Sequence, residues 1–243
     1  MKKIILFLNI FLSLNLYGND SLFTIANQDY ANQSYLQAID KYQSILSSGT
    51  QSSELYYNLG NSYYRLNEIH QAIYNYEKSL KLNPNFTEAY ENLELCNLKL
   101  IDKIEKMPEI FYKIYYKNLK NFFPTQWWKT TSIILIWSFA FIYLIKIITN
   151  RNFNFLQNTF LVFSFLFFII YQDISNDSLE NKEAIIFSQV IDIMSAPSNQ
   201  ANKLFTLHIG TKVKINDQIE NWVNISLANG NKGWVSLKHL KEI

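Results

Sequence analysis

Residues 55–84 read LYYNLGNSYYRLNEIHQAIYNYEKSLKLNP, and this stretch decides the fold of the first part of the chain. The same pattern occurs 34 residues earlier, where Ala26 corresponds to Gly60 and Ala38 corresponds to Ala72. A period of 34 residues is the signature of helix–turn–helix units that stack side by side. Small side chains at these positions let two helices cross closely. The stretch therefore predicts an all-α stack of helix pairs.

The stretch resembles a tetratricopeptide repeat. The residues that carry this resemblance are Tyr56, Leu59, Gly60, Tyr63, Ala72, Tyr76, Ser79 and Pro84. We predict a tetratricopeptide repeat domain over residues 20–104, made of two repeats and a capping helix at Thr87–Lys103. Glu94 stands where a small residue would allow a close crossing, which suits a terminal unit. Stacks of this kind form a concave binding surface and rarely a catalytic one.

The inner face of the predicted stack is the candidate binding site. First helices line this groove in tetratricopeptide domains, so the 34-residue register assigns its residues. The candidate partner-binding residues are Asn27, Tyr30, Tyr57, Asn61, Tyr64 and Arg65, with Phe23, Glu91 and Lys99 beside them. Asparagine and tyrosine suit recognition of a peptide backbone through amide hydrogen bonds and flat aromatic contact. The alternative, that these are solvated helix positions, stays open.

The start of the chain resembles an export signal. Met1-Lys2-Lys3 precedes an apolar run from Ile4 to Leu16. A positive start followed by a short apolar run is typical of a secretory signal. We predict a signal peptide over residues 1–18, with an uncleaved signal anchor as the alternative. Both interpretations export the repeats.

Two apolar stretches predict a transmembrane hairpin. Residues 130–149 carry one charge, at Lys146. A helix of this length, at a rise of 1.5 Å per residue, matches a hydrocarbon core of about 30 Å. We predict one span at 130–149 and a second at 153–171, followed by a polar linker at 172–182.

Residues 108–124 predict a helix that lies at the membrane surface. Lys113, Lys117 and Lys120 fall within about 60° of one another on a helical wheel, beside aromatic residues. A basic stripe beside an aromatic face suits an interfacial helix. The alternative is an ordinary connecting helix with a solvated face.

From residue 183 to residue 243, short alternating apolar segments predict a small all-β barrel. Asn229-Gly230 marks a hairpin turn within it. Trp222 and Trp234 form the possible ligand face of this domain, and we expect at least one of them to pack inside the barrel. The region resembles a bacterial SH3-like (SH3b) domain in Ile193–Ser198, Leu207–Val213, Trp222–Ile225 and Gly233–Val235.

The order of these parts resembles BatE-like proteins of the Bat (aerotolerance operon) family of bacterial envelope proteins. The segment Phe122–Trp127 before the first span is part of the resemblance. The resemblance implies a multi-domain membrane protein that partners von Willebrand-type Bat membrane proteins and a MoxR-type ATPase. It implies no catalytic activity.

The exported N-terminus and the even number of spans predict the topology. We expect the repeat and SH3-like domains on the periplasmic or extracytoplasmic side of the bacterial inner (cytoplasmic) membrane. The turn Lys146–Asn154 then lies inside. The lysines at 113, 117, 120 and 129 oppose this orientation under the positive-inside rule, but the N-terminal signal sets the first crossing.

Composition and motif content narrow the function. A net charge of +2 gives no electrostatic footprint for nucleic acid. The single Cys96 excludes an intramolecular disulfide, and His70, His208 and His239 stand far apart in the sequence. We find no cofactor, metal or catalytic motif. The sequence predicts a non-catalytic, membrane-anchored protein–protein interaction scaffold. The alternative is a membrane-tethered peptidoglycan-binding protein that acts through its SH3-like domain, with an enzyme as the least favoured class.

Overall fold

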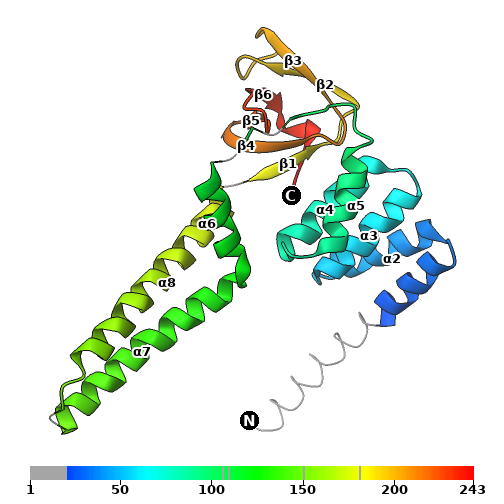
Figure 1. The fold of residues 1–243 in the computed structure, drawn as a ribbon. Coiled ribbons are helices and arrows are strands. Elements are labelled where there is room, and N and C mark those ends of the chain that lie inside the picture. Colours follow the sequence, from blue (N-terminus) through cyan, green and yellow to red (C-terminus); the bar gives the residue numbers. More distant parts are fainter. Residues whose placement is uncertain (1–20, 106, 109, 150, 181) are drawn as a thin grey trace, which may run out of the picture. The chain divides into compact units, whose positions relative to one another are not determined.

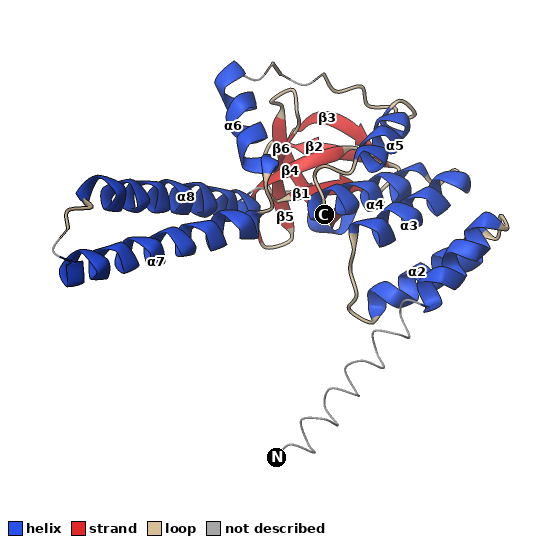
Figure 2. Ribbon diagram, turned by 60° about the horizontal axis from the view of Figure 1, so that its bottom comes forward, coloured by secondary structure: helices blue, strands red, loops and turns tan. Residues whose placement is uncertain are grey.

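The computed structural model describes residues 21–105, 107–108, 110–149, 151–180 and 182–243 (Figure 1). The predicted signal at 1–18 lies outside the described residues. The chain forms two compact units. One unit combines the residues up to Glu105 with Glu183–Ile243, and the other consists of Lys106–Lys182. Figure 2 shows that the first unit contains both helices and strands, whereas the second is helical.

The first unit begins with the helical repeats. A helix at 21–31 pairs with α2 (Tyr35–Ser47), and α3 (Ser53–Arg65) pairs with α4 (Ile69–Leu82). The helix α5 (Thr87–Asn97) follows as the first helix of a third unit. This order confirms the prediction of two helix pairs and a capping helix. The capping helix ends earlier than Lys103, because the main-chain N–H of Lys99 bonds to the carbonyl of Cys96 and tightens the last turn.

The crossing of α3 and α4 depends on Gly60. A Cβ atom at this position would lie 2.7 Å from Cε1 of Tyr76, closer than real side chains approach. Tyr76 itself has no exposed surface. The small residue therefore lets the tyrosine ring fill the space between the two helices, as the sequence pattern predicts.

The second part of this unit is an antiparallel β-domain. Its seven strands form one sheet in the order β3-β2-β6-β5-β4-β1-β7. Residues 227–231 join β5 to β6, which confirms the hairpin predicted at Asn229-Gly230. The strands are β1 (Glu183–Ile186), β2 (Val190–Met194), β3 (Lys203–His208), β4 (Lys212–Ile219), β5 (Trp222–Ser226), β6 (Lys232–Ser236) and β7 (Leu240–Glu242).

The repeats and the β-domain share a hydrophobic core. Ile185 of β1 and Ile243 pack in one cluster with Ile73 of α4 and Cys96 of α5. In a longer repeat array, the next repeat unit would stack against these two helices. Here the β-domain covers them and ends the stack. The two predicted domains therefore form a single packed body, although residues 106–182 separate them in the sequence.

Polar contacts reinforce this shared core. Asp102 accepts hydrogen bonds from the main-chain N–H of His208 (2.7 Å) and from the hydroxyl of Thr211 (2.6 Å). Its other oxygen lies 2.7 Å from Nδ1 of His208. Lys212 bridges Glu77 of α4 at 2.8 Å and Glu183 of β1 at 2.7 Å. The last residues before 106 are therefore bound to strands that come after 183.

The second unit is a helical hairpin preceded by a short helix. It contains α6 (Phe111–Phe122), α7 (Thr125–Thr149) and α8 (Asn154–Glu180). The long helices α7 and α8 run side by side (Figures 1 and 2). Ser132 and Ser164 join them reciprocally, since each hydroxyl donates to the other residue's carbonyl, at 2.9 and 3.0 Å. By length and composition, Thr125–Thr149 and Asn154–Asp177 could each cross a membrane.

The prediction of a polar linker at 172–182 is wrong for most of its length, because α8 continues to Glu180. Asp173 and Asp177 lie one helical turn apart, and both accept hydrogen bonds from Lys120 of α6. The hydroxyl of Tyr116 also donates to Asp173, at 2.9 Å. These contacts give the polar end of α8 partners that its own sequence does not reveal. They also remove Lys120 from the predicted free basic stripe.

Hydrogen bonding stabilises the charged form of Asp102. Burial alone would raise the pKa of this carboxyl group, but hydrogen bonds from Thr211 and His208 outweigh burial and lower it. A carboxyl group with a lowered pKa stabilises the fold above its unfolded pKa. That contribution disappears as the pH falls through the folded value.

We expect Asp102→Ala to lower the free energy of unfolding by about 2 kcal/mol at pH 7, because it leaves donors at His208 and Thr211 without an acceptor. Urea denaturation of the full chain in detergent micelles measures this loss. The matched control is Glu105→Ala, which removes an exposed carboxylate. The difference between wild type and Asp102→Ala should shrink below about pH 4. Equal stability of the two proteins at pH 7 would contradict the assignment.

Candidate functional site

The asparagines of the predicted groove hold the repeats together. Oδ1 of Asn27 accepts a hydrogen bond from the hydroxyl of Tyr42 (2.6 Å) and from Nδ2 of Asn58 (3.0 Å). Tyr42 comes from the same repeat and Asn58 from the next. The same contacts recur 34 positions later, at 2.7 and 2.9 Å, between Asn61, Tyr76 and Asn92. Each asparagine therefore links the two helices of its own repeat to the first helix of the following one.

This ladder uses the acceptor side of both asparagines. Burial raises the pKa of the Tyr42 and Tyr76 hydroxyls, so both phenols stay protonated and donate. Asn27 and Asn61 consequently have a structural role, and their carbonyl oxygens already have two donors each. Sequence reasoning missed this role. The signal was present, because the donors on both sides recur with the same 34-residue spacing.

The aromatic groove candidates also have partners inside the chain. The Tyr57 ring lies 4.8 Å from Phe86, and the Tyr30 ring lies 5.4 Å from Tyr35, measured between centroids. Both Tyr57 and Tyr30 are half-buried. Stacking of this kind fixes the rings in place. These two residues thus present edges rather than whole faces to a partner.

Tyr64 and Arg65 lie closer to solvent and take part in cation–π contacts. Nζ of Lys99 lies 4.2 Å from the centroid of the Tyr64 ring, and the Arg65 guanidinium lies 5.0 Å from that of Tyr35. Arg65 is exposed, whereas Tyr64 is half-buried. Exposed contacts of this type contribute only about 0.5–1 kcal/mol. A partner could therefore displace them at small cost.

The most open part of the first-helix face belongs to α5. Leu95 and Leu98 stand 34 positions after Asn61 and Tyr64, and they are 50% and 73% exposed. Two exposed leucines flanked by charged residues are a normal composition for a protein contact. The register that identified Glu91 and Lys99 also points to these leucines. The sequence analysis passed over them because they look like core residues of a complete repeat.

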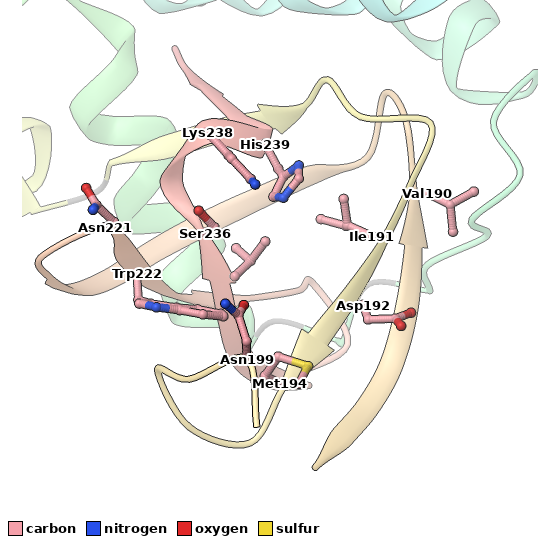
Figure 3. Close-up of a pocket in the computed structure, with 11 residues that line it drawn as sticks. Val190, Ile191, Asp192, Met194, Asn199, Asn221, Trp222, Ser236, Lys238 and His239 are labelled. Atoms are coloured by element: carbon pink, nitrogen blue, oxygen red, sulfur yellow. The ribbon is translucent and has the colours of Figure 1, made fainter. Parts of the chain in front are cut away.

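The β-domain contains a pocket of about 450 Å³ (Figure 3). Trp222 lines it, whereas Trp234 is not among the lining residues. Both tryptophans are half-exposed, so the expectation that at least one packs inside the domain is wrong. Side chains alternate between the faces of a strand. Because Val223 and Val235 occupy the core face, Trp222 and Trp234 point to the other one.

The pocket has an apolar floor and a positively charged side. Ile191 and Val235 are buried residues among those that line it. Lys238 and His239 lie on one side of it and Trp222 on another (Figure 3). Nδ1 of His239 lies 2.6 Å from the hydroxyl of Ser188. Burial lowers the pKa of His239, and Lys238 lowers it further, so this imidazole is neutral at neutral pH.

The model of the tetratricopeptide repeat family matches residues 53–86. These residues form a tetratricopeptide repeat. None of the curated proteins matches the chain. Metal-ligand clusters of three or more His, Cys, Asp or Glu side chains do not occur in the described part of the chain.

Solved structures with similar folds are also tetratricopeptide proteins. The crystal structure of YrrB, described as a TPR protein with an unusual peptide-binding site, is 25% identical, with a TM-score of 0.32. The match covers 35% of this chain and 44% of that one. A crystal structure of MamA is 23% identical, with 36% and 52% covered and a TM-score of 0.32. The Sgt2 TPR domain from Aspergillus fumigatus is 22% identical, with 42% and 60% covered and a TM-score of 0.32. This chain spans about half the length of these proteins.

The structural role of Asn61 can be tested directly. We expect Asn61→Ala to lower the free energy of unfolding by about 2 kcal/mol, because the buried Tyr76 hydroxyl and the Asn92 amide both lose their acceptor. Arg65→Ala is the control on the same helix, and it should change stability by no more than about 0.5 kcal/mol. Urea unfolding of the full chain measures both. A loss for Arg65→Ala as large as that for Asn61→Ala would contradict this division of roles.

Proposed function

We propose that this protein is a non-catalytic, membrane-anchored scaffold that holds a protein partner against the first-helix face of its repeats. The tetratricopeptide repeat at 53–86 carries the proposal, since such repeats are protein-interaction modules. The exposed side chains of Arg65, Leu95 and Leu98 supply the contact surface. They combine a cation with apolar area, the combination that enriches interface hot spots around a dry centre.

The helical hairpin supports the membrane anchor. Both α7 and α8 have the length of a membrane span. Their apolar side chains face outward: Ile148 is 81% exposed and Phe155 is 88% exposed. The core helix of a soluble protein would bury such residues. The reciprocal bonds between Ser132 and Ser164 are the kind of polar contact that joins helices in lipid.

The shared core of the repeats and the β-domain supports the topology. Asp102 precedes the hairpin and His208 follows it, yet the two are in contact. The chain must therefore return to the side of the membrane from which it left, which requires an even number of crossings. We place this unit on the extracytoplasmic side of a bacterial inner membrane, because Met1–Leu16 resembles an export signal.

The order of the parts places the protein in the Bat aerotolerance system in this proposal. The support is the resemblance in sequence order: repeats, a basic aromatic segment, two apolar helices and an SH3-like β-domain. The partners would then be von Willebrand-type membrane proteins of that system. An anchor raises the effective concentration of weak contacts near the bilayer, so the groove does not need high affinity alone.

A second candidate function is peptidoglycan binding through the β-domain. The pocket beside Trp222 favours it, because a half-exposed indole next to a cation is a common carbohydrate- or peptide-binding surface. Co-sedimentation of the full chain with isolated cell walls tests it. Saturable binding that Trp222→Ala removes would move this function ahead of the scaffold.

The groove assignment predicts a separable loss of partner binding. We expect the double variant Arg65→Ala/Leu98→Ala to weaken binding to crosslinked membrane partners by about 2 kcal/mol or more, with folding intact, because both side chains are exposed. Leu36→Ala, which truncates an exposed leucine of the second helix α2, is the matched control. Quantitative mass spectrometry of proteins crosslinked in native membranes measures the effect. Equal recovery of the same partners by double variant and control would defeat the assignment.

The topology predicts the outcome of reporter fusions. Alkaline phosphatase, which is active only outside the cytoplasm, should be active when fused after Lys103 and after Ile243. A fluorescent reporter that folds only in the cytoplasm should be active when inserted after Thr149. Whole-cell activity normalised to protein amount measures each. Cytoplasmic reporter activity after Lys103 or Ile243 would refute the orientation.

A further inference from the structure

The sheet of the β-domain opens between β2 and β6. These neighbouring strands pair at a single position, Met194 opposite Trp234. Each of them pairs along its full length with its other neighbour, β3 or β5. A Cβ atom at Gly233 would lie 2.4 Å from Cγ2 of Ile193, so the two strands touch at this end. They separate immediately afterwards.

The pocket occupies the place of the missing strand pairs. Continuing the antiparallel register from Met194 and Trp234 would set Asp192 opposite Ser236 and Val190 opposite Lys238. Instead of pairing, all four of these residues line the pocket. Figure 3 shows β2 diverging from β6 around them. The pocket is therefore an interruption of the strand ladder rather than a hollow in a closed core.

The backbone of β2 offers unpaired groups to this opening. In an antiparallel pair, alternate residues direct their N–H and C=O groups to the same neighbour. The N–H of Ile209 donates to the carbonyl of Gln189, so residues 189, 191 and 193 bond to β3. Val190 and Asp192 consequently direct their backbone groups toward β6. No strand pair with β6 reaches them within the described residues.

The facing strand is arranged in the same way. The N–H of Leu237 donates to the carbonyl of Asn221, so the odd-numbered residues of β6 bond to β5. Ser236 therefore directs its backbone groups toward β2. Two free strand edges thus face each other across the opening. Free edges of this kind are where an added extended chain forms main-chain hydrogen bonds.

The side chains around the opening define the chemistry of an occupant. Trp222 offers a flat apolar surface, and Ile191 and Val235 provide an apolar floor. Asp192 is already paired with Lys203 at 2.8 Å. Across the parts of the chain that the structure describes, Lys238 has no carboxylate partner. The site therefore has an unsatisfied positive charge beside an apolar surface, which complements a negatively charged occupant.

We propose that the opening between β2 and β6 binds a short extended segment of an acidic partner peptide. The segment adds as a strand to the free edges, places an apolar side chain on Trp222, and pairs a carboxylate with Lys238. A volume of about 450 Å³ falls within the usual range of about 300–1,000 Å³ for binding pockets. The inference rests on the proposed role in protein binding, but it uses a site separate from the repeat groove.

Three matched peptides test the proposal by fluorescence anisotropy with the full chain in detergent micelles. The probe is fluorescein-labelled Ser-Val-Thr-Val-Glu-Ser. In the second peptide proline replaces threonine, which removes a backbone donor and prevents strand pairing. In the third, lysine replaces glutamate. We expect saturable binding of the probe, at least tenfold weaker binding of the proline peptide, and at least threefold weaker binding of the lysine peptide.

Variants of the protein locate the binding. Trp222→Ala should weaken probe binding at least tenfold, and Lys238→Met should abolish the preference for glutamate over lysine. Lys232→Met, an exposed lysine of β6 that does not line the pocket, is the matched control and should change nothing. Thermal unfolding checks that each variant is folded. Because Lys238 is exposed, its variant remains informative if Trp222→Ala unfolds.

Several results would overturn the proposal. These are no saturable binding of any of the three peptides, equal binding of the proline peptide, or unchanged binding by both pocket variants. Binding of a soluble muropeptide in place of all three peptides would favour the cell-wall function. The groove variant Arg65→Ala/Leu98→Ala should bind the probe as wild type does. A failure of this proposal is thereby distinguishable from a failure of the groove assignment.

Discussion

The contact between the repeats and the β-domain is the constraint on which the remaining structure depends. Asp102, at the end of the repeats, bonds to His208 and Thr211 across an intervening segment that contains both apolar helices. Ile185 and Ile243 cover the core side of α4 and α5, where a further repeat unit would otherwise stack. One interface therefore ends the repeat stack and holds the two ends of the hairpin segment in a single body. This is also why an even number of membrane crossings follows.

The asparagine ladder determines how much of the groove is available to a partner. Asn27 and Asn61 spend their carbonyl oxygens on tyrosine and asparagine donors within the stack. Buried polar groups must be satisfied, and this network satisfies them repeat by repeat. The cost of removing one acceptor is therefore structural. The exposed residues that remain, notably Arg65 and Leu98, shift the proposed contact surface toward the capping helix.

The two candidate sites recognise partners by different physics. The repeat face offers side chains from helices whose own backbone groups are already bonded, so its contacts are apolar area and charge. The opening between β2 and β6 offers unpaired backbone groups, so it can select an extended chain by hydrogen bonding. Both sites belong to one packed body. Two weak contacts on such a body reinforce each other when they engage the same partner.

The sequence alone determined the elements that depend on local patterns. The 34-residue period identified the helix pairs, apolar runs identified α7 and α8, and alternation identified the strands, because each pattern lies within one segment. The tertiary structure decided the rest. The continuation of α8 to Glu180 depends on Lys120 of another helix, and the capping of the repeats depends on residues separated by 106 positions, Asp102 and His208. The outward position of Trp222 and the gap in the sheet depend on strand register. Contacts of this kind join residues far apart in the chain, so no local pattern encodes them.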